Sequence, residues 1–96
     1  MAHAVASTPA DYTTPEDGPD VAVEFDPRRA LRQIVATVKT ALADSGLAPE
    51  DISGIGVTSQ RQGIVLLNLE GRPLFAMPNL DMRAAVEGAE LDANRW

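Results

Sequence analysis

The stretch ISGIGVTSQRQGIVLLNLEGRPLFAM, residues 52 to 77, decides the fold that we predict for this chain. It holds two apolar runs, ISGIGV and IVLL, and the residues between them carry two hydroxyls, two amides and a guanidinium. ISGIGVTS predicts a strand whose glycines permit the close approach of another backbone. IVLLNLE, a turn at Gly71 and PLFAM predict a hairpin. The stretch therefore indicates a small β-sheet with polar residues where one strand ends.

A helix is expected before this stretch, in EFDPRRALRQIVATVKTALADSG, residues 24 to 46. Its apolar residues recur at spacings of three and four, which places them on one helical face. These residues are Leu31, Ile34, Val35, Val38 and Leu42. Asp26 suits the N-cap, Pro27 the first helical position and Gly46 the left-handed residue after the end. The following LAPED predicts a turn.

The remaining segments give the domain organisation. PNLDMR predicts a loop, and AAVEGAELDANRW predicts the beginning of a second helix. Residues 1–20 carry turn and breaker residues without a period, so we predict a flexible N-terminal lead followed by one structured segment, residues 21–96. The order helix, strand, hairpin, loop, helix fits a mixed α/β or α+β layer structure. About three strands and one full helix provide little sheet to cover two faces, so we expect an incomplete domain.

Composition excludes several classes of function. A net charge of -6 and a pI near 4.5 argue against nucleic acid or a membrane as partner. The absence of cysteine excludes disulfides, thiolate zinc sites and cysteine nucleophiles. The single histidine, His3, lies at the chain start, so we expect no metal site. No apolar run approaches the roughly 20 residues of a membrane span, and the first residues lack a secretory signal, so we predict a cytoplasmic protein.

The polar run between the two apolar runs has two interpretations on residue types alone. It is a solvated connection with a turn at Gly63, or it is a set of ligands at the end of a strand. In the second interpretation Arg61 donates a forked set of N–H groups. Gln60 and Gln62 each donate and accept, a combination suited to the hydroxyls of a sugar or polyol.

A second polar cluster follows the hairpin. Asn79, Asp81 and Arg83 lie on the predicted loop between strand and helix, where α/β enzymes often carry their sites. The alternative is that Asp81 or Asn79 caps the helix that follows. The GIG at residues 54–56 lacks the lysine of a P-loop and the third glycine of a dinucleotide fingerprint, so we interpret it as a close-packed strand.

In their order, these segments resemble a known family. VEFDPRRAL before a helix, then ISGIGVTSQRQGIVLLNLEGRPLFAMPNLDMRA, is similar to the N-terminal domain of the FGGY carbohydrate kinases over roughly residues 20–91. Four features occur in order: the EFDP helix, the strand IGVTSQ, the hairpin with EGRP, and the D-x-R loop. TSQRQGIV followed by NLDMRA most resembles the branch that contains autoinducer-2 kinase. The resemblance implies a partial, incomplete actin-like ATPase fold, which is ribonuclease H-like.

The resemblance also implies an activity. FGGY kinases transfer the γ-phosphate of ATP, with magnesium, to a hydroxyl of a sugar or polyol. The segment matching Gln60, Arg61 and Gln62 is where family members contact the substrate. Asn79 stands where the family often has Trp, which puts the usual pentose or glycerol substrates in doubt. Asp81 and its neighbour Arg83 match acidic and basic residues of the family's loop, and the resemblance makes them pocket or pocket-supporting residues.

Three parts of such a kinase are expected to be missing here. The lead, with only Thr13 and Thr14, does not resemble the family's phosphate-holding hairpin. In the family, the catalytic aspartate and the adenosine-binding domain lie beyond the position of Trp96. We therefore predict a substrate-binding segment that is inactive alone, with no catalytic, ATP-binding or metal-binding residue of its own, and whose partners are the sugar and the remainder of the kinase. The alternatives are a non-catalytic sugar-binding or interaction module and a disordered remnant.

Overall fold

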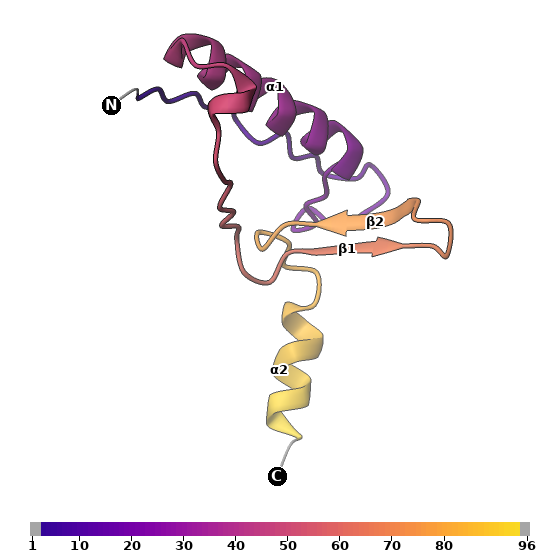
Figure 1. The fold of residues 1–96 in the computed structure, drawn as a ribbon. Coiled ribbons are helices and arrows are strands. Elements are labelled where there is room, and N and C mark those ends of the chain that lie inside the picture. Colours follow the sequence, from indigo (N-terminus) through magenta and orange to yellow (C-terminus); the bar gives the residue numbers. More distant parts are fainter. Residues whose placement is uncertain (1–2, 95–96) are drawn as a thin grey trace. The chain divides into compact units, whose positions relative to one another are not determined.

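A computed structural model describes residues 3–94 of the chain (Figure 1). Its elements in chain order are helix α1 (Pro27–Ser45), the short 3-10 helix η1 (Pro49–Asp51), strands β1 (Ile64–Leu67) and β2 (Pro73–Met77), and helix α2 (Ala85–Ala93). Two helices and one two-stranded sheet form a small mixed α/β structure, so the predicted class is confirmed at this level.

The chain divides into two compact units, which we describe separately. The first unit holds the chain up to Asp11 together with Pro27–Ser59. The second unit holds Tyr12–Asp26 and the chain from Gln60 onward. The boundary at residue 20 and the flexibility of the lead stay predictions.

Helix α1 dominates the first unit and confirms the predicted helix. It begins at Pro27, and Gly46, with φ of 72°, follows its last residue in the left-handed conformation expected after a helix end. The Asp11 carboxylate lies 2.7 Å from the Arg29 guanidinium and ties the chain start to the helix. No residue of α1 is buried, and Leu31, the first residue of its apolar face, is 61% exposed. The apolar face of α1 therefore lacks a cover within the described residues.

The predicted strand ISGIGVTS is wrong. Over residues 3–94 the structure has two strands, β1 and β2, and residues 52–59 belong to neither. Ile55 and Val57 are 85% and 89% exposed. A Cβ added at Gly54 or Gly56 would meet no atom within 4 Å, so the close-packed interpretation of GIG is wrong as well. The physical reason is that a strand needs a hydrogen-bonding neighbour, and residue types alone do not supply one.

The predicted hairpin is confirmed in the second unit. Antiparallel pairing joins Ile64 to Met77, Val65 to Ala76, Leu66 to Phe75 and Leu67 to Pro73, with an irregularity after Leu66. In the loop, the Gly71 amide donates to the Asn68 carbonyl at 3.0 Å, and Gly71 has φ of 74°. The Asn68 side-chain oxygen accepts from the Glu70 and Arg72 amides at 3.1 and 2.8 Å. A local turn, closed by one asparagine and one left-handed glycine, therefore sets the connection.

Replacing Gly71 with Ala is expected to lower the free energy of unfolding of the second unit by about 1 kcal/mol, because a Cβ is unfavourable at positive φ. Thermal denaturation of the purified chain measures this change. Gly63→Ala is the matched control, since its added Cβ would come no closer than 3.6 Å to the Met77 carbonyl oxygen, an ordinary contact. Equal destabilisation by both substitutions would contradict the prediction.

The chain before α1 runs beside the hairpin in the second unit. The Phe25 amide donates to the Ala76 carbonyl at 3.2 Å, and the Met82 amide donates to the Val21 carbonyl at 3.1 Å. Residues 21–25 thus run antiparallel to β2 and to the loop 78–83. The buried apolar side chains of this unit are small, namely Ala22, Ala76 and Pro78. This core fixes where loop 78–83 lies but is too small to stabilise the unit strongly.

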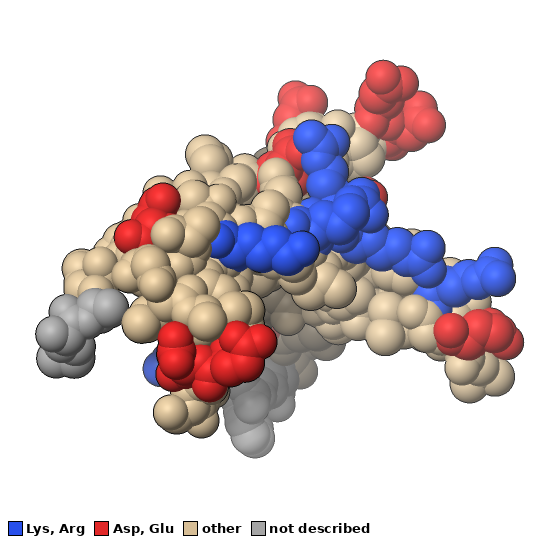
Figure 2. All heavy atoms as spheres, turned by 45° about the horizontal axis from the view of Figure 1, so that its top comes forward, with Lys and Arg blue, Asp and Glu red and all other residues tan. Residues whose placement is uncertain are grey.

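Two further observations concern the charged side chains on the surface and the possibility of membrane-spanning helices. Lys and Arg side chains stand out from the surface in Figure 2. Of the helices formed by residues 3–94, none has both the length and the apolar character needed to span a membrane.

Candidate functional site

The second unit brings Gln60 and Asn79 together. The Asn79 backbone amide donates to the Gln60 side-chain oxygen Oε1 at 3.0 Å. The Gln60 nitrogen Nε2 donates to the Tyr12 hydroxyl at 2.9 Å, and the Tyr12 ring lies 6.2 Å from the Phe25 ring, centroid to centroid. Since a backbone N–H only donates, the atom facing Asn79 must be the amide oxygen, which fixes the orientation of the Gln60 side chain.

Arg61 and Gln62 are placed differently from Gln60. Both residues are exposed, and nothing within residues 3–94 holds either side chain. Gln62 has φ of 62°, and it is the one described non-glycine residue with positive φ. Such a conformation is uncommon for a residue with a Cβ and tends to occur at functional sites. The two side chains are therefore free to meet a ligand, and the backbone that carries them is unusual.

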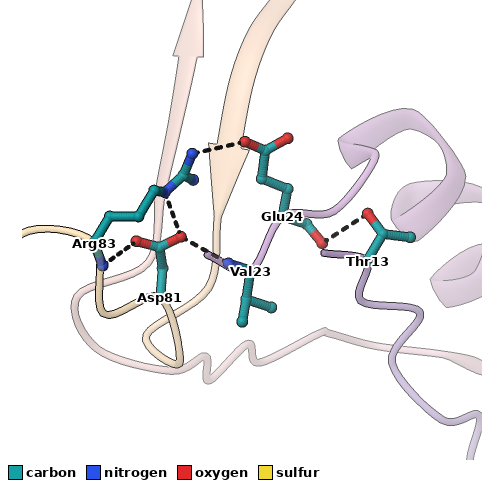
Figure 3. A network of polar contacts seen from close by, with 5 residues as sticks. All are labelled: Thr13, Val23, Glu24, Asp81 and Arg83. Atoms are coloured by element: carbon teal, nitrogen blue, oxygen red, sulfur yellow. Dashed lines mark hydrogen bonds and ion pairs between the residues drawn. The ribbon is translucent and has the colours of Figure 1, made fainter. Parts of the chain in front are cut away.

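Asp81 anchors loop 78–83 to the chain before α1 (Figure 3). Its Oδ2 accepts from the Val23 amide and from Arg83 Nε, both at 2.8 Å, and its Oδ1 accepts from the Arg83 amide at 3.1 Å. The Asp81 side chain is only 3% exposed. Val21 and Phe25, on either side of Val23, form backbone hydrogen bonds with Met82 and Ala76. Between these two bonds, the Asp81 carboxylate accepts from the Val23 amide in place of a main-chain carbonyl.

Arg83 extends the network from Asp81 to Glu24. Its NH1 donates to Glu24 Oε1 at 2.9 Å, and its Cζ lies 4.8 Å from the centroid of the Phe75 ring. Glu24 in turn exchanges two backbone hydrogen bonds of 2.8 Å with Thr13. The Thr13 hydroxyl also donates to the Glu24 carbonyl at 3.5 Å (Figure 3). Arg83 NH2 is enclosed and has no hydrogen-bond partner among the described residues. Asp81, Arg83 and Glu24 therefore form one clamp between loop 78–83 and the segment before α1, which we call the Asp81 clamp.

The electrostatics of the Asp81 clamp follow from its hydrogen bonds. The hydrogen bond from the Arg83 side chain holds the pKa of Asp81 below its ordinary value of 3.8, against the opposing effect of burial, and the Val23 and Arg83 amides add to the lowering. The same bond raises the pKa of Arg83 above its ordinary value. Asp81 is thus an anion near neutral pH and a weak base, which does not suit it to accept a proton in catalysis.

The structure brings some of the predicted residues together, and it adds two partner residues that the sequence patterns missed. Gln60 contacts Asn79, and Asp81 follows two positions later on the same loop. Among the described residues, no hydrogen bond joins these three to the side chains of Arg61 or Gln62. The missed residues are Tyr12, in the segment taken as a lead, and Glu24. The β-branched residues of the run Val21-Ala22-Val23 before Glu24 and Phe25 could have indicated an extended segment there.

The alternative that Asp81 or Asn79 caps the second helix is wrong. The residue before α2 is Ala84, and no side chain caps that end. The Asp81 oxygens bond to Val23 and Arg83 instead.

Comparison with known proteins finds sugar kinases. The chain is 43% identical to the autoinducer-2 kinase of Escherichia coli strain K12 over 75 residues, which cover 76% of this chain and 14% of that enzyme. It is 36% identical to the autoinducer-2 kinase of Photorhabdus laumondii over 77 residues, covering 78% of this chain and 14% of that enzyme. It is 40% identical over 73 residues to YoaC of Bacillus subtilis, a putative sugar kinase, covering 76% of this chain and 14% of that protein.

These matches confirm the resemblance to FGGY carbohydrate kinases. Within that class, the chain is homologous to one segment of the autoinducer-2 kinases and spans about 14% of their length. No protein-family model matches the chain, and no solved structure matches it significantly.

Cofactor binding has little support within the described residues. No group of three or more His, Cys, Asp or Glu side chains in the described part of the chain is placed to hold a metal ion. The sequence contains no P-loop or dinucleotide glycine pattern. We derive no step through ATP or magnesium.

Proposed function

We propose that this chain is the substrate-binding segment of an ATP-dependent carbohydrate kinase, folded in the full enzyme as part of an actin-like ATPase (ribonuclease H-like) domain. The observation that carries the proposal is the 43% identity to a segment of autoinducer-2 kinase. The hydrogen bond between Gln60 and Asn79, two of the proposed ligand residues, supports it. The sugar of the Escherichia coli relative is, by its name, autoinducer-2. We propose autoinducer-2 or a related sugar as the ligand, and ATP with magnesium as requirements of the full enzyme only.

The proposed ligand residues differ in how free their side chains are to bind a sugar. Arg61 and Gln62 are exposed and free to bind hydroxyls, and Gln60 has unused hydrogen-bonding capacity. Asn79 is exposed, and its backbone amide is engaged by Gln60. Asp81 is enclosed and accepts three hydrogen bonds, so it supports the site by holding loop 78–83.

The remainder of a kinase is the proposed macromolecular partner. Helix α1 exposes an apolar face, with Ile34 at 60% and Val38 at 57% exposure, and Val57 of the unpaired segment is 89% exposed. Apolar surface of this kind gains free energy when another part of the protein covers it. The matched relatives are several times longer than this chain, which makes the remainder of such an enzyme the fitting cover.

A chimera tests the proposed function. In it, residues 12–91 of this chain replace the matched segment of the Escherichia coli autoinducer-2 kinase. We expect ATP-dependent phosphorylation of autoinducer-2, because the segment supplies sugar contacts while the rest of the enzyme supplies the chemistry. Phosphate transfer from labelled ATP measures the activity. A chimera that folds, as judged by circular dichroism and a cooperative melt, yet neither binds nor phosphorylates the sugar would refute the proposal.

The isolated chain is the comparison in the same assay. We expect no phosphate transfer from it, because Asp81, the most enclosed carboxylate of the proposed site, is a weak base held by three hydrogen bonds. Measurable turnover by the isolated chain would overturn its proposed inactivity. If the chain binds the sugar while the folded chimera is inactive, the non-catalytic sugar-binding module becomes the better description.

A further inference from the structure

The Gln60 side chain is held by one hydrogen bond at each end of its amide. Oε1 accepts from the Asn79 backbone amide, and Nε2 donates to the Tyr12 hydroxyl. An amide side chain has two donor hydrogens and two acceptor lone pairs. One hydrogen on Nε2 and one lone pair on Oε1 are therefore left over, on neighbouring atoms of the same group.

Tyr12 is itself placed by its surroundings. Its ring contacts the Phe25 ring in a tilted arrangement, with 58° between the ring planes. The next residue, Thr13, is bonded in both directions to Glu24. The hydroxyl that accepts from Gln60 is thus carried by a ring and a backbone that are both fixed.

We propose that Tyr12 is a positioning residue of the sugar site: it orients the Gln60 amide so that this amide presents one N–H and one oxygen lone pair together to a diol of the sugar. A diol matches this arrangement, because one of its hydroxyls accepts from Nε2 while its neighbour donates to Oε1. Without Tyr12 the amide still has Asn79 as partner but loses the acceptor that keeps Nε2 in place. The ligand in this inference rests on the proposed function; the positioning of Gln60 by Tyr12 does not.

The positioning is tested on the complete 96-residue chain by NMR, without any sugar. Tyr12→Phe removes the hydroxyl and keeps the ring against Phe25. We expect the Gln60 side-chain NH2 signals to move toward the values of a free amide, and the Asn79 amide to exchange with solvent about 2- to 10-fold faster. The Thr13 and Glu24 amides should keep their exchange rates, since their bonds do not involve the hydroxyl. Thr14→Ala, which removes a hydroxyl two residues away, is the matched control and should change none of these signals.

Two NMR results would overturn the proposal. One is an unchanged Gln60 side-chain signal in Tyr12→Phe. The other is a wild-type Asn79 amide that exchanges as fast as in an unstructured peptide, because Gln60 would then have no fixed orientation to maintain.

The role in sugar recognition is tested with autoinducer-2 in the chimera that carries residues 12–91. We expect Tyr12→Phe to raise KM about 2- to 10-fold, and Gln60→Ala to raise it further. In the Gln60→Ala background, Tyr12→Phe should have no additional effect, since Tyr12 acts through Gln60. An equal effect in both backgrounds would overturn the proposal. If the folded chimera does not bind autoinducer-2 at all, the proposed function fails, and the NMR result still decides whether Tyr12 positions Gln60.

Discussion

Asp81→Ala is expected to disrupt the second unit more than any other single substitution of a charged residue there. It removes the acceptor for the Val23 amide and for two Arg83 donors at once, and all three hydrogen bonds are partly buried. In hydrogen exchange of the purified chain, we expect the Val23 amide to exchange about 10- to 100-fold faster. The Phe25 and Met82 amides, which bond on either side of Val23, should follow it.

Two variants serve as controls for Asp81→Ala. Asp17→Ala removes an exposed carboxylate from the same unit and should leave the three exchange rates unchanged. Glu24→Gln weakens the more exposed ion pair of the clamp and should have a small effect, because exposed ion pairs contribute little. An Asp81→Ala spectrum with wild-type protection at Val23 would show that the carboxylate is not the anchor of loop 78–83.

The same carboxylate predicts how stability depends on pH. The pKa of Asp81 is lowered in the folded chain by its hydrogen bond with the Arg83 side chain, so the folded state holds this proton less tightly than the unfolded state does. The contribution of Asp81 to the free energy of unfolding is therefore fully present above its ordinary pKa of 3.8. It is lost as the pH falls through the lower pKa of the folded state. Asp81→Asn should remove this part of the acid sensitivity, while the sensitivity due to other carboxylates remains.

Elements with local causes could be predicted from the sequence. Helix α1 follows from its apolar spacing, Pro27 at its first position and Gly46 after its end, all within one segment. The hairpin follows from Asn68 and Gly71, because the turn that joins the strands closes on its own backbone. In both cases the stabilising partners lie a few residues apart, which is the range that a sequence pattern covers.

Contacts between distant segments could not be predicted in this way. Ile55 and Val57 have the residue types of a strand, but pairing depends on a second segment that the pattern does not identify. Asp81 was recognised as a candidate, yet its bond to Val23 spans 58 positions, which is beyond the range of a sequence pattern. Tyr12 was passed over because the residues around it favour turns, although its hydroxyl meets Gln60 from 48 positions away.

Arg61→Ala is expected to have the largest effect on sugar recognition. Arg61 lies in the turn that Gln60 and Gln62 flank, its side chain has no partner within the described residues, and its forked N–H groups suit adjacent oxygen atoms of a sugar. In the chimera with residues 12–91, we expect a loss of about 1 to 3 kcal/mol, which is about 5- to 150-fold in kcat/KM for autoinducer-2. Steady-state kinetics with the sugar as the varied substrate measures it.

The comparison with Arg72→Ala decides what an effect of Arg61→Ala means. Arg72 is an exposed arginine of the hairpin loop, so its loss changes net charge by the same amount without touching the proposed site. A fall in kcat/KM for Arg61→Ala alone would assign the loss to a contact with the sugar. Equal falls for both would indicate a general charge effect. No fall for either would return the run from Ser59 to Gln62 to a solvated turn, because an arginine that bonds the sugar cannot be removed without leaving the oxygen it served unpaired.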